Sequence, residues 1–245
     1  MPEYFEQYLS MCMSNIAKIR DKSGEAIVAA AVAVADSIQH DKGYFLFGSG
    51  HSALVAHEAY WRSGGLAPAL PIRDPMEGDA ERLSGYAPIL LARYPLQTGG
   101  TIVVVSNSGV NPLPIEVASI SRDRGLTVIA ITCLSHSKNT PSRHPTSKKL
   151  YEVSDIVIDT MGEIGDAILE IPGSPGKIGP ISTLAGIAIV DSISVQAVAI
   201  LIERGITPPV LVSANLPAGD AHNLEIADRY REKLIRYEVP GVDAT

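Results

Sequence analysis

The sequence predicts an α/β fold, a three-layer αβα sandwich on a mostly parallel five-stranded sheet, preceded by a helical extension. Short apolar runs recur along the chain without the polar alternation of a half-exposed strand. Strands buried on both faces have this composition. Segments with helical spacing separate the runs, and such alternation is typical of a doubly wound sandwich. Hydrophobic residues form 46% of the 245 residues, which is enough for a substantial core.

The chain is expected to begin with two helices, over residues 4–20 and 24–39. Both segments carry apolar side chains at helical spacing, and the second is rich in alanine. The apolar runs that follow are the expected strands of the sheet: 44–47, 69–72, 101–105, 127–131 and 156–158.

Three further segments are expected to form helices. They cover residues 52–63, 112–124 and 181–204. Gly125 and Gly205 stand where two of these helices would end, the usual place for a C-cap glycine. Pro112 and Pro180 stand near helix starts, where the missing N–H of proline costs nothing.

The organisation expected from these elements is a single domain over residues 1–245. It comprises N-terminal helices over 1–42, a sandwich core over 43–212 and a C-terminal segment over 213–245. Residues 133–149 form the most loop-like stretch of the core. Residues 239–245 are expected to be a frayed tail.

Composition and charge narrow the class of protein. The net charge of −7 argues against a nucleic-acid partner, which would need a basic face, and suits a cytoplasmic protein. The two cysteines, Cys12 and Cys133, show no metal-binding or redox spacing, which fits a reducing compartment without disulfides. We expect no metal and no cofactor. The N-terminus lacks the pattern of a signal peptide.

Residues 181–202 are apolar and long enough to span a membrane. They carry Asp191 and Gln196, however, and a charge at bilayer depth is costly. We therefore expect a core or interface helix and no membrane partner. A helix that is apolar almost all round needs more cover than one domain usually supplies, so a homodimer or homotetramer is expected.

Three loops carry hydroxyl groups at places where strands end or helices begin. They are GSGHS (48–52), SNSG (106–109) and GPIST (179–183). Ligands of open α/β sheets bind at the carboxyl ends of the strands. Free N–H groups, the helix dipole and Ser or Thr donors together suit an anion. Simple N-capping by serine is the alternative for each loop taken alone.

These loops resemble those of the sugar isomerase (SIS) domain family, which includes phosphoheptose isomerases. The residues that carry the resemblance are Gly48 to Ser52, Ser106 to Gly109 and Ile181 to Thr183. The likeness covers nearly the whole chain and is greatest to uncharacterised single-domain SIS proteins. It implies a flavodoxin-like sandwich that holds a phosphate through Ser52, Ser106 and Ser108. Asn111 stands where the family usually has threonine.

The phosphosugar site implied by the resemblance comprises hydroxyl, amide and glycine residues of these loops and of the next strand end. They are Ser49, Gly50, Ser52, Ser106, Asn107, Ser108, Asn111, Thr132, Ser182 and Thr183.

Isomerisation of a sugar requires groups that transfer protons, and the candidates are His51, Glu58 and His222. Glu58 has an alternative role, because Arg62 stands at i+4, the spacing of a surface ion pair. An ungapped comparison places Glu58 at the metal-binding histidine of phosphoheptose isomerases and Arg62 at their catalytic glutamate. Their mechanism is therefore not transferred to this chain.

The leading hypothesis is a sugar-phosphate isomerase acting by aldose–ketose proton transfer, or a related lyase. A non-catalytic phosphosugar sensor is the alternative, although no DNA-binding region is evident. A dinucleotide site is a further alternative, since GSGHSA matches G-x-G-x-x-G/A and Asp74 follows the next strand. Two helices before the first strand argue against it. The basic stretch 136–149 could cover an anion or lie in solvent.

Overall fold

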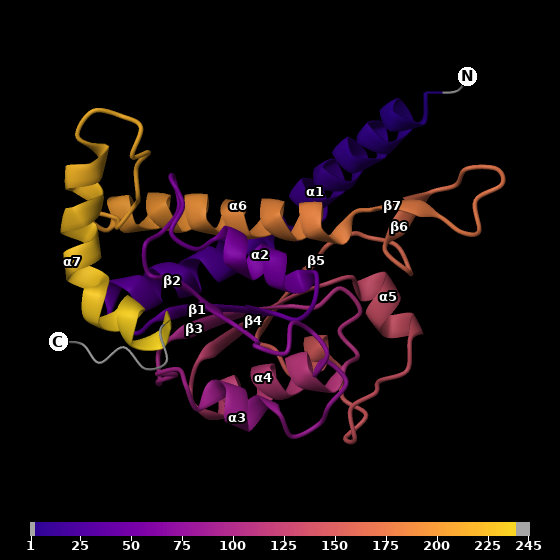
Figure 1. The fold of residues 1–245 in the computed structure, drawn as a ribbon, viewed down its shortest axis with the longest axis horizontal. Coiled ribbons are helices and arrows are strands. Elements are labelled where there is room, and N and C mark those ends of the chain that lie inside the picture. The colour runs from indigo at the N-terminus through magenta and orange to yellow at the C-terminus, as the bar shows by residue number, and fades with distance from the viewer. Residues whose placement is uncertain (1–2, 239–245) are drawn as a thin grey trace.

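The computed structural model describes residues 3–238 and contains a five-stranded parallel sheet of order β2-β1-β3-β4-β5 (Figure 1). The strands are β1 (Tyr44–Gly48), β2 (Ala69–Ile72), β3 (Thr101–Val105), β4 (Thr127–Thr132) and β5 (Ile156–Asp159). All five coincide with predicted runs, within one residue at each end. The strand order is that of flavodoxin-like folds. In such folds β2 is added on one side of β1, and β3 and the later strands are added on the other side.

Helices cover both faces of the sheet, as predicted for runs without polar alternation. One face packs on α1 (Tyr4–Gln39), α2 (Ser52–Glu58) and α6 (Ser182–Glu203). The opposite face packs on α3 (Ala87–Leu91) and α4 (Pro112–Asp123). Along β3, Val103 and Val105 point into the first layer and Ile102 and Val104 into the second. Successive side chains of a strand alternate between faces, so both sets must be apolar.

The prediction of two N-terminal helices is wrong, because α1 is one helix of 36 residues. The predicted break, residues 21–23, lies inside the helix, directly before Gly24. The Ser23 hydroxyl is buried and donates to the Asp159 carbonyl at 3.1 Å. A glycine inside a helix costs about 1 kcal/mol relative to alanine, which the packing of α1 on α6 and β5 outweighs.

Helix α2 ends at Glu58, before the predicted end at residue 63. Trp61 has a φ of 46°, a left-handed conformation that a helix cannot contain. The expected loop over residues 133–149 contains a short helix, α5 (Leu134–Asn139), and is followed by the 3-10 turn η1 (Leu150–Glu152).

Two features of the fold were not predicted. An antiparallel hairpin of β6 (Ala167–Leu169) and β7 (Ile178–Pro180) precedes α6. The C-terminal segment forms a helix, α7 (Gly219–Glu238). The predicted frayed tail over residues 239–245 lies outside the described residues.

Helix α6 is the one helix within residues 3–238 whose length and hydropathy would allow it to cross a membrane. It packs against α1 and α2 as a layer of the sandwich, which is how core helices of similar composition behave. Several of its apolar side chains nevertheless face outward, including Leu184, Val195 and Ile202.

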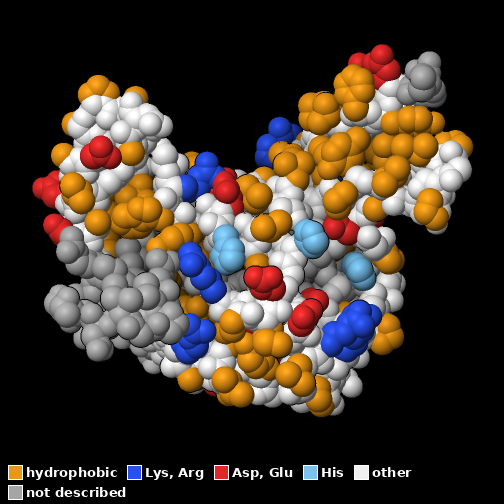
Figure 2. All heavy atoms as spheres, viewed as in Figure 1, with side chains coloured by type: hydrophobic (Ala, Val, Ile, Leu, Met, Phe, Trp, Pro, Cys, Tyr) orange, Lys and Arg blue, Asp and Glu red, His pale blue; other side chains and the backbone are white. Residues whose placement is uncertain are grey.

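The start of α1 and the β6–β7 hairpin project together from the body of the molecule (Figure 1). Tyr8 of α1 donates its hydroxyl proton to the Pro180 carbonyl at 2.7 Å and so ties the two elements together. Hydrophobic side chains gather on this projection (Figure 2), and Phe5, Leu9 and Met13 are among the exposed ones.

Candidate functional site at the carboxyl ends of the strands

A small pocket opens at the edge of the sheet where the carboxyl ends of the strands meet. Its cavity volume is about 10 Å³, which is room for about one water molecule. Its polar lining consists of Ser52, Asn107, Thr160, Ser182 and Thr183, and its apolar lining of Val55, Val105 and Ile131. We call it the hydroxyl pocket. It lies between the loops that follow β1 and β3, the point where flavodoxin-like sheets bind ligands.

The loop after β3 is held in place by its own hydrogen bonds. The Ser106 N–H donates to the Ile131 carbonyl at 3.0 Å, and the Ser106 hydroxyl oxygen accepts from the Gly109 N–H at 3.2 Å. The Thr132 hydroxyl donates to the Asn107 carbonyl at 3.2 Å. Ser106 and Thr132, both predicted to contact the ligand, therefore shape the loop, and neither lines the pocket.

Asn107 and Thr160 bring unsatisfied polar atoms to the pocket. Asn107 Oδ1 and Thr160 Oγ1 are buried and have no hydrogen-bond partner within residues 3–238. Such an atom costs about 1–3 kcal/mol of stability, which a ligand can recover by bonding to it. Thr160 is not among the site residues predicted from the sequence. It directly follows β5, as Ser106 follows β3 and Ser49 follows β1, and this shared position was the available signal.

The loop after β1 contributes only Ser52 to the lining. Ser49 is buried, and its hydroxyl has no partner within residues 3–238. Gly50 is exposed and lies against Gly78, whose added Cβ would come within 2.9 Å of the Gly50 Cα. Ser49 and Gly50 thus form the wall between this loop and the neighbouring loop over residues 73–86.

The start of α6 is closed by a carboxylate. Asp166 Oδ1 accepts from the N–H groups of Ile181 at 3.1 Å and Ser182 at 2.8 Å. Asp166 Oδ2 accepts from the Ser182 hydroxyl at 2.8 Å. Ser182 and Thr183 lie in the pocket as predicted, but the hydroxyl proton of Ser182 is already committed.

The remaining two predicted binding residues lie at the start of α4. Asn111 is buried and its Oδ1 accepts from Arg143 Nη1 at 2.7 Å. Ser108 is half-buried beside it and does not line the pocket. Arg143 brings a positive charge from the segment 140–149 to the loop after β3, which supports the hypothesis that this segment covers an anion.

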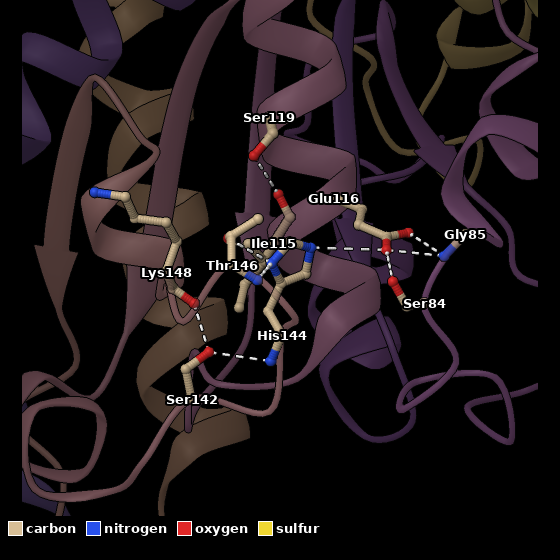
Figure 3. A network of polar contacts seen from close by, with 9 residues as sticks. All are labelled: Ser84, Gly85, Ile115, Glu116, Ser119, Ser142, His144, Thr146 and Lys148. Atoms are coloured by element: carbon tan, nitrogen blue, oxygen red, sulfur yellow. Dashed lines mark hydrogen bonds and ion pairs between the residues drawn. The ribbon is translucent and has the colours of Figure 1, made fainter.

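Glu116 of α4 links the two segments that flank this loop (Figure 3). Its carboxylate accepts from the Ser84 hydroxyl at 2.6 Å and from the Gly85 N–H at 2.8 Å. On its other side His144 Nε2 lies 3.7 Å from Glu116 Oε1, and both side chains are largely buried. The segments 73–86 and 140–149 are therefore fastened to one carboxylate beside the start of α4.

The candidate catalytic residues are not brought into the pocket. His51 is exposed at the start of α2 and does not line it. Glu58 forms an ion pair with Arg62, the alternative role that the i+4 spacing indicated. The ion pair lies at the end of α2, a full helix length from Ser52.

His222 lies on α7 and away from the hydroxyl pocket. Its Nε2 is 2.9 Å from the Val210 carbonyl oxygen, and Val210 pairs with Leu66 ahead of β2. Tyr230 of the same helix lines a cavity with Gly43 and Tyr44 at the start of β1. The segment around His222, predicted to be irregular, is helical. The contacts of His222 and Tyr230 place this helix at the amino ends of the strands and not at the carboxyl ends.

A different histidine lies near the pocket. His136 of α5 is half-buried, and the Gly165 N–H points at its Nδ1 at 3.5 Å. Burial lowers the pKa of His136, and the nearby positive charge of Arg143 lowers it further. Residue 165 precedes Asp166, so His136 lies beside the segment that holds the start of α6.

Two other expectations bear on cofactors. No three His, Cys, Asp or Glu side chains within residues 3–238 lie close enough together to hold a metal ion. The predicted ribose-binding acid of a dinucleotide site, Asp74, accepts from the Met76 N–H at 2.9 Å and the Tyr86 hydroxyl at 3.2 Å. Asp74 is thus engaged within its own loop.

Comparison with known proteins agrees with this geometry. The family model of the SIS domain matches residues 7–133. A UPF0309 protein of Shouchella clausii is 36% identical over 94% of this chain and 98% of its own length. One of Listeria monocytogenes is 37% identical over 93% of this chain and 96% of its own length.

Solved structures share the fold at low sequence identity. The phosphoheptose isomerase of Neisseria gonorrhoeae has a TM-score of 0.55 and 15% identity, over 81% of this chain and 97% of its own. The NanR protein of Vibrio vulnificus, solved with ManNAc-6P, has a TM-score of 0.52 and 14% identity, over 95% of this chain and 70% of its own.

Proposed function

Because this chain belongs to the SIS domain family, we propose that it binds a sugar phosphate in the hydroxyl pocket and isomerises it. The observation that carries the proposal is the pair of buried, unpartnered atoms, Asn107 Oδ1 and Thr160 Oγ1, in the lining of a polar pocket. A ligand rich in hydroxyl and phosphoryl groups would satisfy both atoms. The fold likeness to a phosphoheptose isomerase supports the choice of ligand class.

The phosphate is expected to lie against the loop after β3, where one positively charged side chain favours an anion. The positively charged Arg143 donates a hydrogen bond to Asn111 and so places its charge beside this loop. The start of α4 offers no free N–H group in its first three residues, because Pro112 and Pro114 have none and the Leu113 N–H donates to the Glu81 carbonyl at 3.2 Å. The cavity volume of about 10 Å³ is far below the range of about 300–1,000 Å³ typical for small-molecule sites. Part of the sugar would therefore extend beyond the pocket.

Isomerisation or elimination requires an acid–base group in reach of the sugar carbons. His136 is an ionisable side chain near Asp166, and burial together with the charge of Arg143 lowers its pKa and so disfavours its charged form. A second candidate function is binding without turnover, as in a sensor. It is favoured by the absence of Glu58, His51 and His222 from the lining of the pocket in the part of the chain that the structure describes.

We further propose an oligomeric state and a cellular location for the chain. The outward-facing apolar side chains of α6 and of the α1 projection support a homodimer or homotetramer. Both cysteines are free and buried, and the net charge is negative, which supports a cytoplasmic location without a nucleic-acid or membrane partner.

A ligand screen tests the proposal. The melting temperature is measured with a panel of sugar phosphates, with the same sugars lacking phosphate, and with NAD(P). A ligand that binds only the folded chain raises the melting temperature. We expect a rise with a sugar phosphate and none with its sugar. A rise with NAD(P) alone would contradict the proposal and support the dinucleotide alternative.

Turnover is then followed by proton NMR of the bound sugar phosphate in deuterated water. An isomerase exchanges a carbon-bound proton next to the carbonyl with solvent and forms the second sugar. Binding without exchange and without product would identify a sensor.

A further inference from the structure

Asp166 makes the two ends of the hydroxyl pocket chemically different. One end, at the start of α6, carries a carboxylate bonded to Ser182, and the other end, at the loop after β3, has Arg143 nearby. We infer that Asp166 fixes the direction of the ligand, by excluding phosphate from the start of α6 and turning Ser182 into an acceptor for a sugar hydroxyl. The inference rests on the proposed function and names how one end of the same site selects its ligand.

The first step concerns charge. The start of a helix of 22 residues would ordinarily attract an anion. Here the Asp166 carboxylate already occupies it, accepting from the N–H groups of Ile181 and Ser182. A phosphate placed beside Ser182 would meet a like charge across one side chain. Beside Asn111, at the start of α4, lies the positive charge of Arg143 instead, which favours phosphate on that side.

The second step concerns the direction of a hydrogen bond. The Ser182 hydroxyl donates its one proton to Asp166 Oδ2 at 2.8 Å. Its oxygen can then only accept from a ligand. A sugar hydroxyl can donate to it, whereas a phosphate dianion has only acceptor oxygens. Ser182 therefore selects a neutral hydroxyl at this end of the pocket.

The third step is an independent sign of a ligand at this end. Thr160 is 2% exposed, lines the pocket with Ser182 and Thr183, and has no partner for its Oγ1 within residues 3–238. Unlike Ser182, the Thr160 hydroxyl is free to donate or accept. The two side chains together can hold one sugar hydroxyl that donates to Ser182 and accepts from Thr160.

The backbone supports a dedicated role for this aspartate. Asp166 has a φ of 73°, a left-handed conformation that aspartate and asparagine tolerate better than most residues. Asparagine can therefore replace it with little change in shape. Its Oδ1 can still accept from the two N–H groups, while its Nδ2 donates to Ser182 and turns the serine proton towards the pocket.

The test compares Asp166→Asn with the wild-type chain in calorimetric titrations with inorganic phosphate and with each sugar phosphate of the panel. We expect inorganic phosphate to bind about tenfold more tightly to Asp166→Asn, because one negative charge is removed. We expect a sugar phosphate that binds the wild type to bind the variant about three- to tenfold more weakly, because the oriented acceptor is lost.

Three controls locate the effect. Glu163→Gln removes a carboxylate from the same segment, where Glu163 pairs with Lys177 on the surface, and should leave both affinities unchanged. Adding Ser182→Ala to Asp166→Asn should reduce the gain in phosphate affinity by the part that the turned serine proton contributes, and leave the part that comes from the lost charge. Asp166→Gly accepts the same φ without the charge, and should show the phosphate gain if the asparagine variant folds poorly in melting experiments.

The outcomes separate the two proposals. Equal phosphate affinity in Asp166→Asn, Asp166→Gly and wild type overturns the role of Asp166, whether or not sugar phosphates bind. If no sugar phosphate binds the wild type, the proposed function fails. The phosphate titrations alone then still decide whether Asp166 excludes an anion from α6.

Discussion

Thr160 and Asn107 each bury a polar atom that finds no partner in the described part of the chain, and both residues line the same pocket. A folded chain retains such atoms at a cost in stability, and a functional ligand is the usual compensation. The two residues follow different strands, so the pocket depends on the parallel arrangement that aligns the strand ends.

Replacing Thr160 with valine separates stability from binding. We expect Thr160→Val to raise the free energy of unfolding by about 1 kcal/mol, because it removes a buried hydroxyl without a partner. Sugar-phosphate affinity should fall. Chemical denaturation and titration measure the two effects.

Thr101→Val is the matched control for this variant. Thr101 is equally buried, but its hydroxyl donates to the Ala33 carbonyl at 2.9 Å and accepts from Ser37 at 3.1 Å, at the opposite end of the sheet. This control should lose about 1 kcal/mol of stability and keep its ligand affinity. A stability loss in both variants would mean that the Thr160 hydroxyl is satisfied in solution.

Gly109 closes the loop after β3 and has two reasons to be glycine. Its φ is 62°, and an added Cβ would lie 2.8 Å from Thr132 Oγ1. We expect Gly109→Ala to destabilise the fold by about 2–3 kcal/mol and to weaken sugar-phosphate binding, because the loop must shift. Thermal unfolding and titration measure both effects.

Gly165→Ala is the control that separates the cost of a left-handed backbone from the cost of the close contact with Thr132. Gly165 has a φ of 87°, but an added Cβ there would meet nothing within 4 Å. This variant should lose only about 1 kcal/mol. Equal losses in the two variants would contradict the close contact between Gly109 and Thr132.

Among the elements, α1 shows how packing overrides a local break. The helix continues through Gly24 because its two halves share one apolar face on α6 and β5. An added Cβ at Gly24 would meet no atom within 4 Å. We expect Gly24→Ala to stabilise the chain by about 0.5–1 kcal/mol, measured by chemical denaturation. No gain would indicate that residues 4–20 and 24–39 behave as separate helices.

The segments 73–86 and 140–149 are held in place by other elements. Neither has a long regular element of its own, and both are fastened to Glu116 of α4 (Figure 3). Arg143 reaches Asn111 from one of these segments. The positions of the loop after β3 and of its positive charge thus depend on contacts among three separate stretches of the chain.

At the scale of the whole molecule, exposed apolar side chains on α1 and α6 remain uncovered by the single chain. Val195 of α6 is 70% exposed. We expect Val195→Glu to lower the mass measured by light scattering to that of a smaller assembly, because a charge would be buried at the interface. Ile89→Glu on α3, across the sheet and 69% exposed, is the control and should leave the mass unchanged. A monomeric wild type would contradict the proposed assembly.

The sequence alone determined the parallel sheet, since uninterrupted apolar runs are stable as strands only when both faces are covered. It also located the loop after β3 and the start of α6, because glycine, proline and hydroxyl residues act on their immediate neighbours. Ser52, Asn107, Ser182 and Thr183 were therefore found before the structure and do line one pocket.

Only the tertiary structure decided which side chains meet. Thr160 reaches the pocket through strand order. Asp166 reaches Ser182 from the start of a hairpin that the sequence pattern did not reveal, and His136 reaches Gly165 from a helix inside an expected loop. His222 was misplaced because α7 packs at the opposite end of the sheet. Contacts between distant segments depend on how whole elements bury their surfaces, and local residue patterns carry little of that information.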